Sequence, residues 1–176
     1  MFSPEQQPHR PPEKRYRQSA GILAYRHTER GLEVLLGHPG GPFWAHKDAE
    51  SWTMFKGEFD SATETPIEAA RREFAEETGF DPDSLGEELL DLGVHRQSGG
   101  KLVYAFAAEA DFDAAAVSSN IFDLEYPPRT GRFVTIPEID RAAWFTLSEA
   151  ADKIMKGQRP FLERLAARIG DARNNG

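Results

Sequence analysis

Apolar residues along this chain fall into short blocks separated by polar turns, and the spacing inside each block predicts its secondary structure. Compact apolar runs of strand length occur at residues 19–26, 32–39, 52–55, 89–97, 101–110 and 141–147. Turns at residues 29–31 and 98–100 join two pairs of these runs, so we expect two β-hairpins. Residues 111–140 hold only short extended pieces broken by proline and glycine, and they predict no regular element.

Helical spacing is clearest between Thr65 and Gly79. Thr65 suits the N-cap, Pro66 suits the first helical position, and Glu68 completes a T-x-x-E capping box. Gly79 stands where a left-handed C-terminal cap is favoured. Between these ends, three residues recur at helical spacing and form a narrow apolar stripe: Ile67, Ala70 and Phe74.

Two further helices are predicted near the C-terminus. Ser148 is a candidate N-cap for a helix over residues 148–155. A second amphipathic helix is predicted over residues 158–169, with an apolar face made of Phe161, Leu162, Leu165 and Ile169. Strands in hairpins, one helix in the middle and helices at the end together indicate an α+β fold in which helices cover a mixed sheet.

The bulk composition favours a single acidic domain. A length of 176 residues fits one domain, and the formal net charge of −8 argues against a protein that coats nucleic acid. The sequence contains no cysteine, which excludes disulfides and zinc–thiolate sites. No apolar run approaches the roughly 20 residues of a membrane span, and no secretory signal is recognisable. We therefore expect a cytoplasmic protein with no membrane partner and no sequence-specific binding to nucleic acid, either monomeric or homodimeric.

The predicted helix at residues 65–79 carries an unusual cluster of carboxylates. Glu73, Glu76 and Glu77 crowd one edge of this helix, where like charges repel one another by roughly 0.2–0.5 kcal/mol per pair. A cation held among them would turn this repulsion into attraction, and oxygen ligands suit a hard ion such as Mg²⁺. For an isolated E-x-x-E-E, the alternative is an acidic helix face that is simply solvated.

The residues around this cluster match a longer pattern. The run R-E-F-A-E-E-T-G-F occupies residues 72–80, Glu64 lies eight residues before Arg72, and a glycine loop precedes both. From Gly57 onward the stretch resembles the Nudix box, G-x(5)-E-x(7)-R-E-U-x-E-E-x-G-U, in which U is apolar. The sequence departs from this pattern once, because six residues instead of five separate Gly57 from Glu64. We interpret the departure as a one-residue insertion in the loop at residues 60–63.

The resemblance implies a fold and a domain layout. Nudix domains are three-layer α/β/α sandwiches with a mixed β-sheet, which agrees with the order of the predicted elements. On this basis a Nudix hydrolase domain occupies residues 18–170. Residues 1–17 are rich in proline, glutamine and charge and predict a disordered arm, and residues 171–176 predict a frayed C-terminus.

The resemblance also implies a chemistry. Nudix enzymes use Mg²⁺ or Mn²⁺ to hydrolyse a nucleoside diphosphate linked to another group, because water attack on so anionic a linkage needs charge neutralisation and a base. By the family's pattern, Glu76 and Glu77 match metal ligands. Glu73 matches a ligand in some members and the base in others, so both Glu73 and Glu76 are base candidates. Arg72 matches the arginine that orients the carboxylates, and Gly57 is a candidate backbone contact to the metal.

Further candidates lie outside the helix. Glu138 and Asp140 are candidates for an additional carboxylate from a distant loop, of the kind that some Nudix members use. Candidate substrate-binding residues come from the box entrance and from variable loops: Lys56, His38, Trp44 and Arg129. For each of these residues the alternative is a purely structural or solvated role.

The sequence therefore predicts a metal-dependent pyrophosphohydrolase, with a nucleotide or another diphosphate-containing small molecule as its partner. A nucleoside triphosphate and a dinucleoside polyphosphate are the two substrate classes that we favour. The alternative is a non-catalytic Nudix-like module that binds nucleotide as a regulator. The intact pair Glu76 and Glu77 favours the enzyme, and the loop insertion is the one feature that favours the module. The linked group, the number of metal ions, the base and the cellular role stay open.

Overall fold

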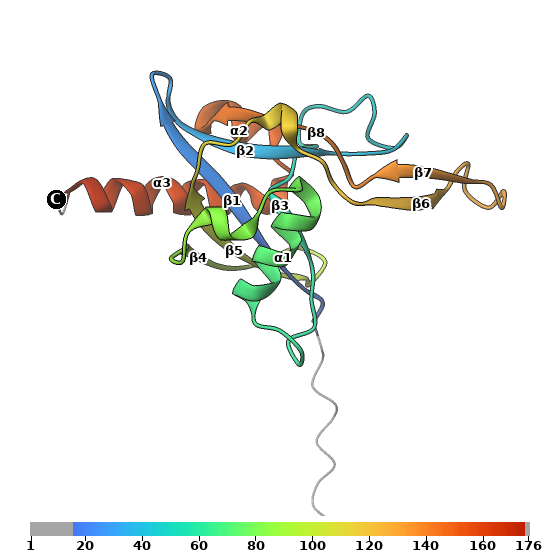
Figure 1. The fold of residues 1–176 in the computed structure, drawn as a ribbon, viewed down its shortest axis with the longest axis horizontal. Helices are drawn as coiled ribbons and strands as arrows, with labels where there is room; N and C mark the ends of the chain where they lie inside the picture. The colour runs from blue at the N-terminus through green and yellow to red at the C-terminus, as the bar shows by residue number, and fades with distance from the viewer. Residues whose placement is uncertain (1–15, 175–176) are drawn as a thin grey trace, which may run out of the picture.

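The computed structural model describes residues 16–174, so the predicted arm at residues 1–17 lies outside the described residues except for Tyr16 and Arg17. Eleven main elements follow one another along the chain (Figure 1): β1 (Gln18–Thr28), β2 (Gly31–Pro39), β3 (Phe55–Glu58), α1 (Pro66–Thr78), β4 (Leu90–Arg96), β5 (Leu102–Glu109), β6 (Ile121–Glu125), β7 (Phe133–Pro137), β8 (Ile139–Thr146), α2 (Leu147–Lys153) and α3 (Arg159–Asn174). Short 3₁₀ turns lie at Pro82–Leu85, Ala114–Ala116 and Lys156–Gln158.

The long strand β1 is the centre of a mixed sheet whose main path runs β4-β5-β1-β2-β8. On one side β1 pairs in parallel with the whole of β5, from Gln18 opposite Leu102 to Tyr25 opposite Glu109. On the other side it pairs with two antiparallel strands in turn, first with β3 and then with β2. This arrangement brings the start of β1, the end of β3 and the start of β5 to the same edge of the sheet.

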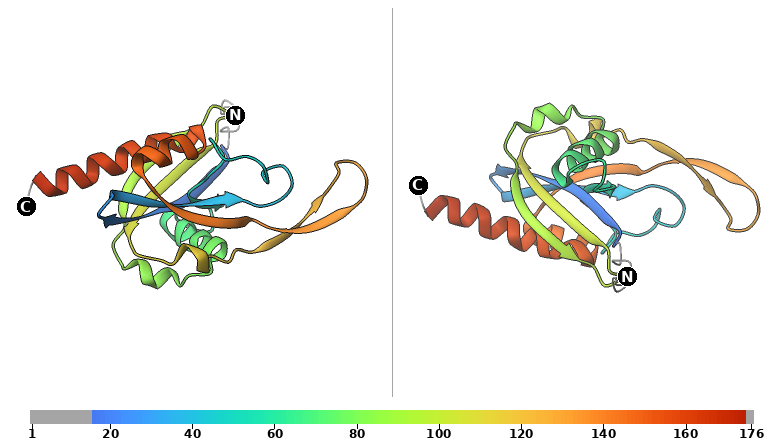
Figure 2. Two further views of the ribbon diagram at one scale, coloured as in Figure 1. Left: turned by 90° about the horizontal axis from the view of Figure 1, so that it is seen from above. Right: turned by 90° about the horizontal axis from the view of Figure 1, so that it is seen from below.

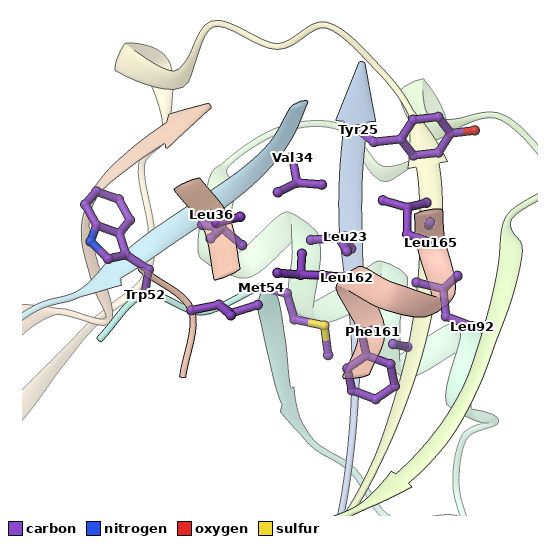
Figure 3. Packing of buried hydrophobic residues seen from close by; sticks show 14 of the residues in the cluster. Leu23, Tyr25, Val34, Leu36, Trp52, Met54, Leu92, Phe161, Leu162 and Leu165 are labelled. Carbon is purple, nitrogen blue, oxygen red and sulfur yellow. The ribbon is translucent and has the colours of Figure 1, made fainter. Parts of the chain in front are cut away.

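Helices cover both faces of the sheet and complete three layers, which confirms the predicted architecture. Figure 2 shows α1 on one side of the sheet and α3 on the other. Alternate residues of β1 serve the two cores: Ile22 packs with Phe74 of α1, and Leu23 packs with Phe161 of α3. Figure 3 shows the second of these cores, in which side chains of α3 lie over β1 and β2. Because both faces are covered, the central strands are apolar almost throughout.

Helix α1 begins and ends as its sequence predicts. Thr65 and Glu68 form both halves of the capping box, and Gly79 closes the helix with a φ of 75°. One residue of the predicted stripe behaves differently, because Ile67 lies near the helix start and is 36% exposed. Ala69, which was not part of the predicted stripe, is fully buried in its place.

The C-terminal helices differ from the prediction at their ends. Helix α2 is capped by Thr146 and not by Ser148, since Thr146 and Glu149 form a complete capping box two residues earlier. Helix α3 continues to Asn174, several residues beyond the predicted end. No helix in the described part of the chain is long and apolar enough to cross a membrane.

Residues 111–140, for which no element was predicted, contain a separate two-stranded sheet. Strands β6 and β7 pair in register from Ile121 opposite Pro137 to Glu125 opposite Phe133. In Figure 1 this hairpin projects away from the three-layer body. Its inner end lies close to the loop after β2, because a Cβ on Gly41 would stand 2.4 Å from Ile136 Cδ1.

Candidate active site

A cleft of about 530 Å³ opens beside α1, where the ends of several strands meet. The loop after β2 and the inner end of the β6–β7 hairpin complete its walls. Acidic, basic and apolar side chains all line it: Pro39, Gly40, Trp44, Lys56, Gly57, Glu58, Glu73, Glu77, Lys101, Phe122 and Glu138. The cleft thus brings together residues that are up to a hundred positions apart in the sequence.

Two of the three clustered glutamates of α1 face this cleft. Glu73 and Glu77 are each only 8% exposed, because α1 packs this edge against β3. Glu77 Oε2 accepts a hydrogen bond of 2.9 Å from the backbone N–H of Lys56. Glu76 lies beside them, and its side chain is 39% exposed.

Gly57 allows the carboxylate of Glu73 to lie directly against the backbone of β3. A Cβ at this position would stand 2.1 Å from both Cδ and Oε2 of Glu73. Real Cβ atoms essentially never approach another heavy atom so closely. Gly57 does not have a positive φ, so its backbone conformation does not require glycine. Glycine is required here because a side chain would occupy the space of the Glu73 carboxylate.

Arg72 joins the acidic residues of the helix to the loop before it. Its guanidinium donates to both oxygens of Glu64, at 2.6 and 3.1 Å, in a two-pronged contact. It also donates to Glu73 Oε1 at 2.7 Å and lies 3.3 Å from Glu76 Oε2. Arg72 thus holds Glu73 by a hydrogen bond and places a positive charge within the acidic cluster.

The extra loop residue does not disturb this arrangement. Asp60 folds the loop back on itself, with its carbonyl accepting from the N–H groups of Thr63 and Glu64 at 3.0 and 3.1 Å. Its side chain accepts from the N–H of Ala62 at 2.9 Å. The insertion is absorbed in this turn, and Glu64 still reaches Arg72.

The carboxylates of the cleft repel one another. Burial, together with the charges of Glu73 and Glu138, raises the pKa of Glu77 to about 9. Burial is also the main cause that raises the pKa of Glu73, and burial with repulsion from Glu76 raises the pKa of Glu138. Among residues 16–174, no three acidic or histidine side chains stand close enough together to form a ready-made metal site. The oxygen donors nevertheless fit a divalent cation, because its charge would relieve the repulsion that Arg72 offsets only in part.

The strand ends add basic residues to the cleft. Burial and the nearby Lys101 lower the pKa of Lys56, against the opposing effect of the surrounding glutamates. Lys101 Nζ lies 3.3 Å from Glu58 Oε1, and Arg17 donates to the same carboxylate. Burial favours a higher pKa for Glu58, but Lys101 and Arg17 outweigh it and hold the pKa below its ordinary value. The cleft therefore holds the carboxylates of α1 together with cationic groups from the strand ends.

Several predicted site residues lie in this cleft and others do not. Glu138 lines it, whereas Asp140 faces away toward His38 and Arg141. His38 is fully buried, and the prediction that it contacts substrate is therefore not supported. Its Nε2–H donates to the carbonyl of Lys47 at 2.7 Å, while Nδ1 lies 3.3 Å from Asp140 Oδ1 without hydrogen-bond geometry.

The two loop candidates for substrate binding are also separated. Trp44 lines the cleft, with Lys47 Nζ 5.0 Å from its ring centre. Arg129 lies in the connection between β6 and β7, at the hairpin end remote from the cleft, with a φ of 62°. The predicted phosphate contact by Arg129 is therefore not supported by its position.

Three charged or aromatic residues of the cleft were not predicted from the sequence. Glu58 lies inside the box and Lys101 at the start of an apolar run, and neither was a candidate. Phe122 lies in the segment that had no predicted element. A basic residue placed directly after the Gly-Gly turn at the start of β5 was the only local signal for Lys101.

This chain is similar to known proteins both in its sequence and in its fold. A family model described as "NUDIX domain" matches residues 15–165. A search of curated proteins returned no match. Among solved structures, the fold is similar to the NUDIX domain of Shewanella oneidensis NrtR in complex with ADP ribose, with a TM-score of 0.60, 15% identity, and coverage of 92% of this chain and 94% of that chain.

Two further solved structures share the fold. The Ap4A hydrolase of C. elegans, in a binary complex, has a TM-score of 0.59 and 19% identity, and the match covers 87% of this chain and 98% of that chain. A mutT/nudix family protein from Listeria innocua has a TM-score of 0.59 and 18% identity, with coverage of 95% and 100%. At these identities the likeness establishes the fold.

Proposed function

This chain belongs to the NUDIX family of hydrolases, which act on diphosphate bonds, and we propose that it is a metal-dependent pyrophosphohydrolase that cleaves a nucleoside diphosphate linked to a further group. We favour a nucleoside triphosphate or a dinucleoside polyphosphate as the substrate. The proposal goes beyond family membership in naming the metal dependence, the residues and the substrate class.

One observation carries the proposal. Glu73, Glu77 and Glu138 come from two distant parts of the chain and line a single cleft, although their charges repel one another. Such an arrangement is costly unless a ligand of opposite charge completes it. A divalent cation with the phosphates of a substrate matches both the oxygen donors and the size of the cleft.

Each side chain then has a defined task. Glu73, Glu76, Glu77 and Glu138 are the residues that would hold the cation, which when bound supplies charge neutralisation and a more acidic water. Arg72 orients Glu73 and Glu76 for this purpose. Either Glu73 or Glu76 accepts the proton of the attacking water. The water oxygen forms a bond to phosphorus, the bridging P–O bond breaks, and the leaving phosphate departs with the electron pair.

The nucleotide preference rests on the other walls of the cleft. Trp44 and Phe122 offer aromatic surfaces that suit stacking on a base, and Lys56 lies where it can contact phosphate. Two proteins with the same fold, the ADP-ribose complex and the Ap4A hydrolase, hold or act on nucleotides according to their descriptions. This supports a nucleotide substrate without deciding its class.

The test is a product-resolved hydrolysis screen. Nucleoside triphosphates, dinucleoside polyphosphates, nucleotide sugars and dinucleotide cofactors are offered with Mg²⁺ or Mn²⁺ to the parent and to Glu77→Gln. Glu163→Gln is the matched control, because Glu163 is exposed on α3 away from the cleft. We expect one class to be cleaved by the parent and the control, with a loss of about 10²-fold or more in Glu77→Gln.

The same screen separates catalysis from regulation. A regulatory module would bind nucleotide equally well with and without Mg²⁺, would hydrolyse nothing, and would tolerate Glu77→Gln. This alternative keeps some support from the absence, within residues 16–174, of a ready-made cluster of ligands. Hydrolysis that depends on both the metal and Glu77 would exclude it.

A further inference from the structure

Three strand ends bring two cations and a carboxylate together at the edge of the cleft. Arg17 directly precedes β1, Glu58 ends β3, and Lys101 directly precedes β5. Backbone hydrogen bonds hold these ends side by side, with Leu102 N–H donating to the carbonyl of Arg17 at 2.9 Å. Phe59 N–H donates to the carbonyl of Gln18 at 3.1 Å. The cluster is therefore positioned by the sheet and not by a flexible loop.

Glu58 occupies the centre of this cluster. Its carboxylate accepts from Arg17, lies 3.3 Å from Lys101 Nζ, and attracts the more deeply buried Lys56. Lys56 and Glu58 are two residues apart in β3, so both side chains point to the same side of the sheet and line the same cleft. One carboxylate is thus shared among three cationic side chains.

The position of Glu58 is unusual for a structural ion-pair partner. It lines the cleft that receives the substrate, and its side chain is 49% exposed, so solvent and ligands reach it. The buried carboxylates Glu73 and Glu77 are on the α1 wall, whereas this cationic cluster is at the strand ends. A carboxylate bound to a cationic pocket offers the same kind of acceptor oxygens as a phosphate group.

We propose that Arg17, Lys56 and Lys101 form a subsite for a non-scissile phosphate of a substrate with three or more phosphates, and that Glu58 fills this subsite until the substrate displaces it. The inference rests on the proposed function, because it takes the scissile diphosphate to lie beside the α1 carboxylates. It extends that function by assigning selectivity for polyphosphate chains over simple diphosphates to named residues.

The proposal predicts opposite effects for two substitutions in the same cluster. Glu58→Gln removes the competing carboxylate and frees the cations, so binding of a long phosphate chain should tighten about 3-fold to 10-fold. Lys101→Met removes one cation, so the same binding should weaken about 10-fold. We expect a chain of only two phosphates, held by the cation at the α1 carboxylates, to leave the cluster unoccupied, so its binding should change by less than about 2-fold in either variant.

The experiment measures binding of inorganic tripolyphosphate and inorganic pyrophosphate by calorimetry in Mg²⁺, with analysis of the cell contents to verify that the probes stay intact. Glu163→Gln controls for the lost acidic charge. Lys156→Met controls for the lost basic charge, since the Lys156 side chain is 70% exposed and pairs only with Glu50 in the described part of the chain. Circular dichroism and thermal unfolding establish that each variant is folded.

The outcomes separate this inference from the proposed function. Opposite shifts for tripolyphosphate with unchanged pyrophosphate binding support the subsite, even if the parent hydrolyses nothing. Equal shifts for both probes, or tripolyphosphate binding that Lys101→Met leaves unchanged, overturn the subsite. If the subsite is overturned while hydrolysis still depends on Glu77, the proposed function stands without it.

Discussion

The substitution Gly57→Ala tests the close contact between the backbone of β3 and the carboxylate of Glu73. The added Cβ would stand 2.1 Å from Cδ and Oε2 of Glu73, whereas an ordinary contact begins near 3.4 Å. The carboxylate must therefore retreat by about 1.3 Å, because β3 and α1 hold the two backbones in place. Its 2.7 Å hydrogen bond from Arg72 cannot survive that movement unchanged.

The expected cost in stability is small. Moving the Glu73 side chain costs on the order of 1 kcal/mol in rotamer strain and weakened hydrogen bonding. Replacing glycine by alanine in a strand offsets about 0.4–1 kcal/mol of this by restricting the unfolded chain. We therefore expect the free energy of unfolding to fall by less than about 1 kcal/mol.

The expected cost in activity is large, because a displacement of about 1 Å at a reacting or metal-holding group lowers the rate on the order of 10²-fold. The assay compares kcat and the Mn²⁺ concentration for half-maximal activity with those of the parent, on the substrate identified by the screen. Gly99→Ala is the matched control, since its Cβ meets nothing within 4 Å and its φ is not positive. Activity in Gly57→Ala within about 3-fold of the parent would refute the argument that this glycine exists to admit Glu73.

Three further predictions concern buried and paired groups. In metal-free protein, the folded pKa of about 9 for Glu77 lies above its unfolded value, so the contribution of Glu77 to stability should be full below about pH 4.5 and should be lost as the pH rises to about 9, by on the order of 1 kcal/mol or more. Glu77→Gln should remove this part of the pH dependence of thermal unfolding, and an unchanged slope would contradict the assignment. Arg72→Met should lower the free energy of unfolding of metal-free protein by about 1–3 kcal/mol, and saturating Mn²⁺ should restore part of this loss. If thermal scans show the same loss of stability with and without Mn²⁺, Arg72 does not neutralise the cluster. Gln158→Ala should lower the free energy of unfolding, measured in urea, by about 2–4 kcal/mol. The reason is that Gln158 Oε1 accepts from Met54 N–H at 2.9 Å in the core, and the substitution leaves this donor without its partner. A loss below about 1 kcal/mol would mean that water replaces the side-chain amide.

The parts of the fold that the sequence predicts well are those set by local chemistry. The ends of α1 follow from Thr65, Glu68 and Gly79, whose capping preferences act within one turn of the helix. The two hairpins likewise follow from short turns between apolar runs. The N-cap of α2 was available to the same reasoning, because Thr146 and Glu149 form a capping box that is visible in the sequence.

What could not be predicted depends on contacts between distant segments. Nothing near Leu102 reveals that β5 pairs in parallel with β1, and only that pairing brings Lys101 beside Glu58. The hairpin β6–β7 escaped prediction because its strands alternate weakly and Pro127 and Pro128 follow β6 in the connection between them. For the same reason Phe122 was missed, whereas Glu138 was found because acidic residues before a core strand are conspicuous.

The candidate site shows the same division. Helical periodicity alone places Glu73, Glu76 and Glu77 on one edge of α1, whereas the role expected of Arg72 came from the resemblance to the Nudix box. His38 looked like a candidate contact because it stands near an aromatic loop, but the alternation of β2 turns its side chain into the protein interior. His38 is the next-to-last residue of β2, and the sequence alone does not show whether a residue so near a strand end belongs to the strand or to the loop after it.

Arg72 has a consequence for how this protein responds to its surroundings. Structural zinc domains illustrate the opposite case, in which the chain is unfolded until its metal arrives. Here a built-in guanidinium contacts Glu64, Glu73 and Glu76 and supplies positive charge from within the chain. We therefore expect newly made chains to fold and persist when divalent cations are scarce. The supply of divalent cations would then determine what fraction of the folded protein is active. The total amount of folded protein would depend only on its synthesis and turnover.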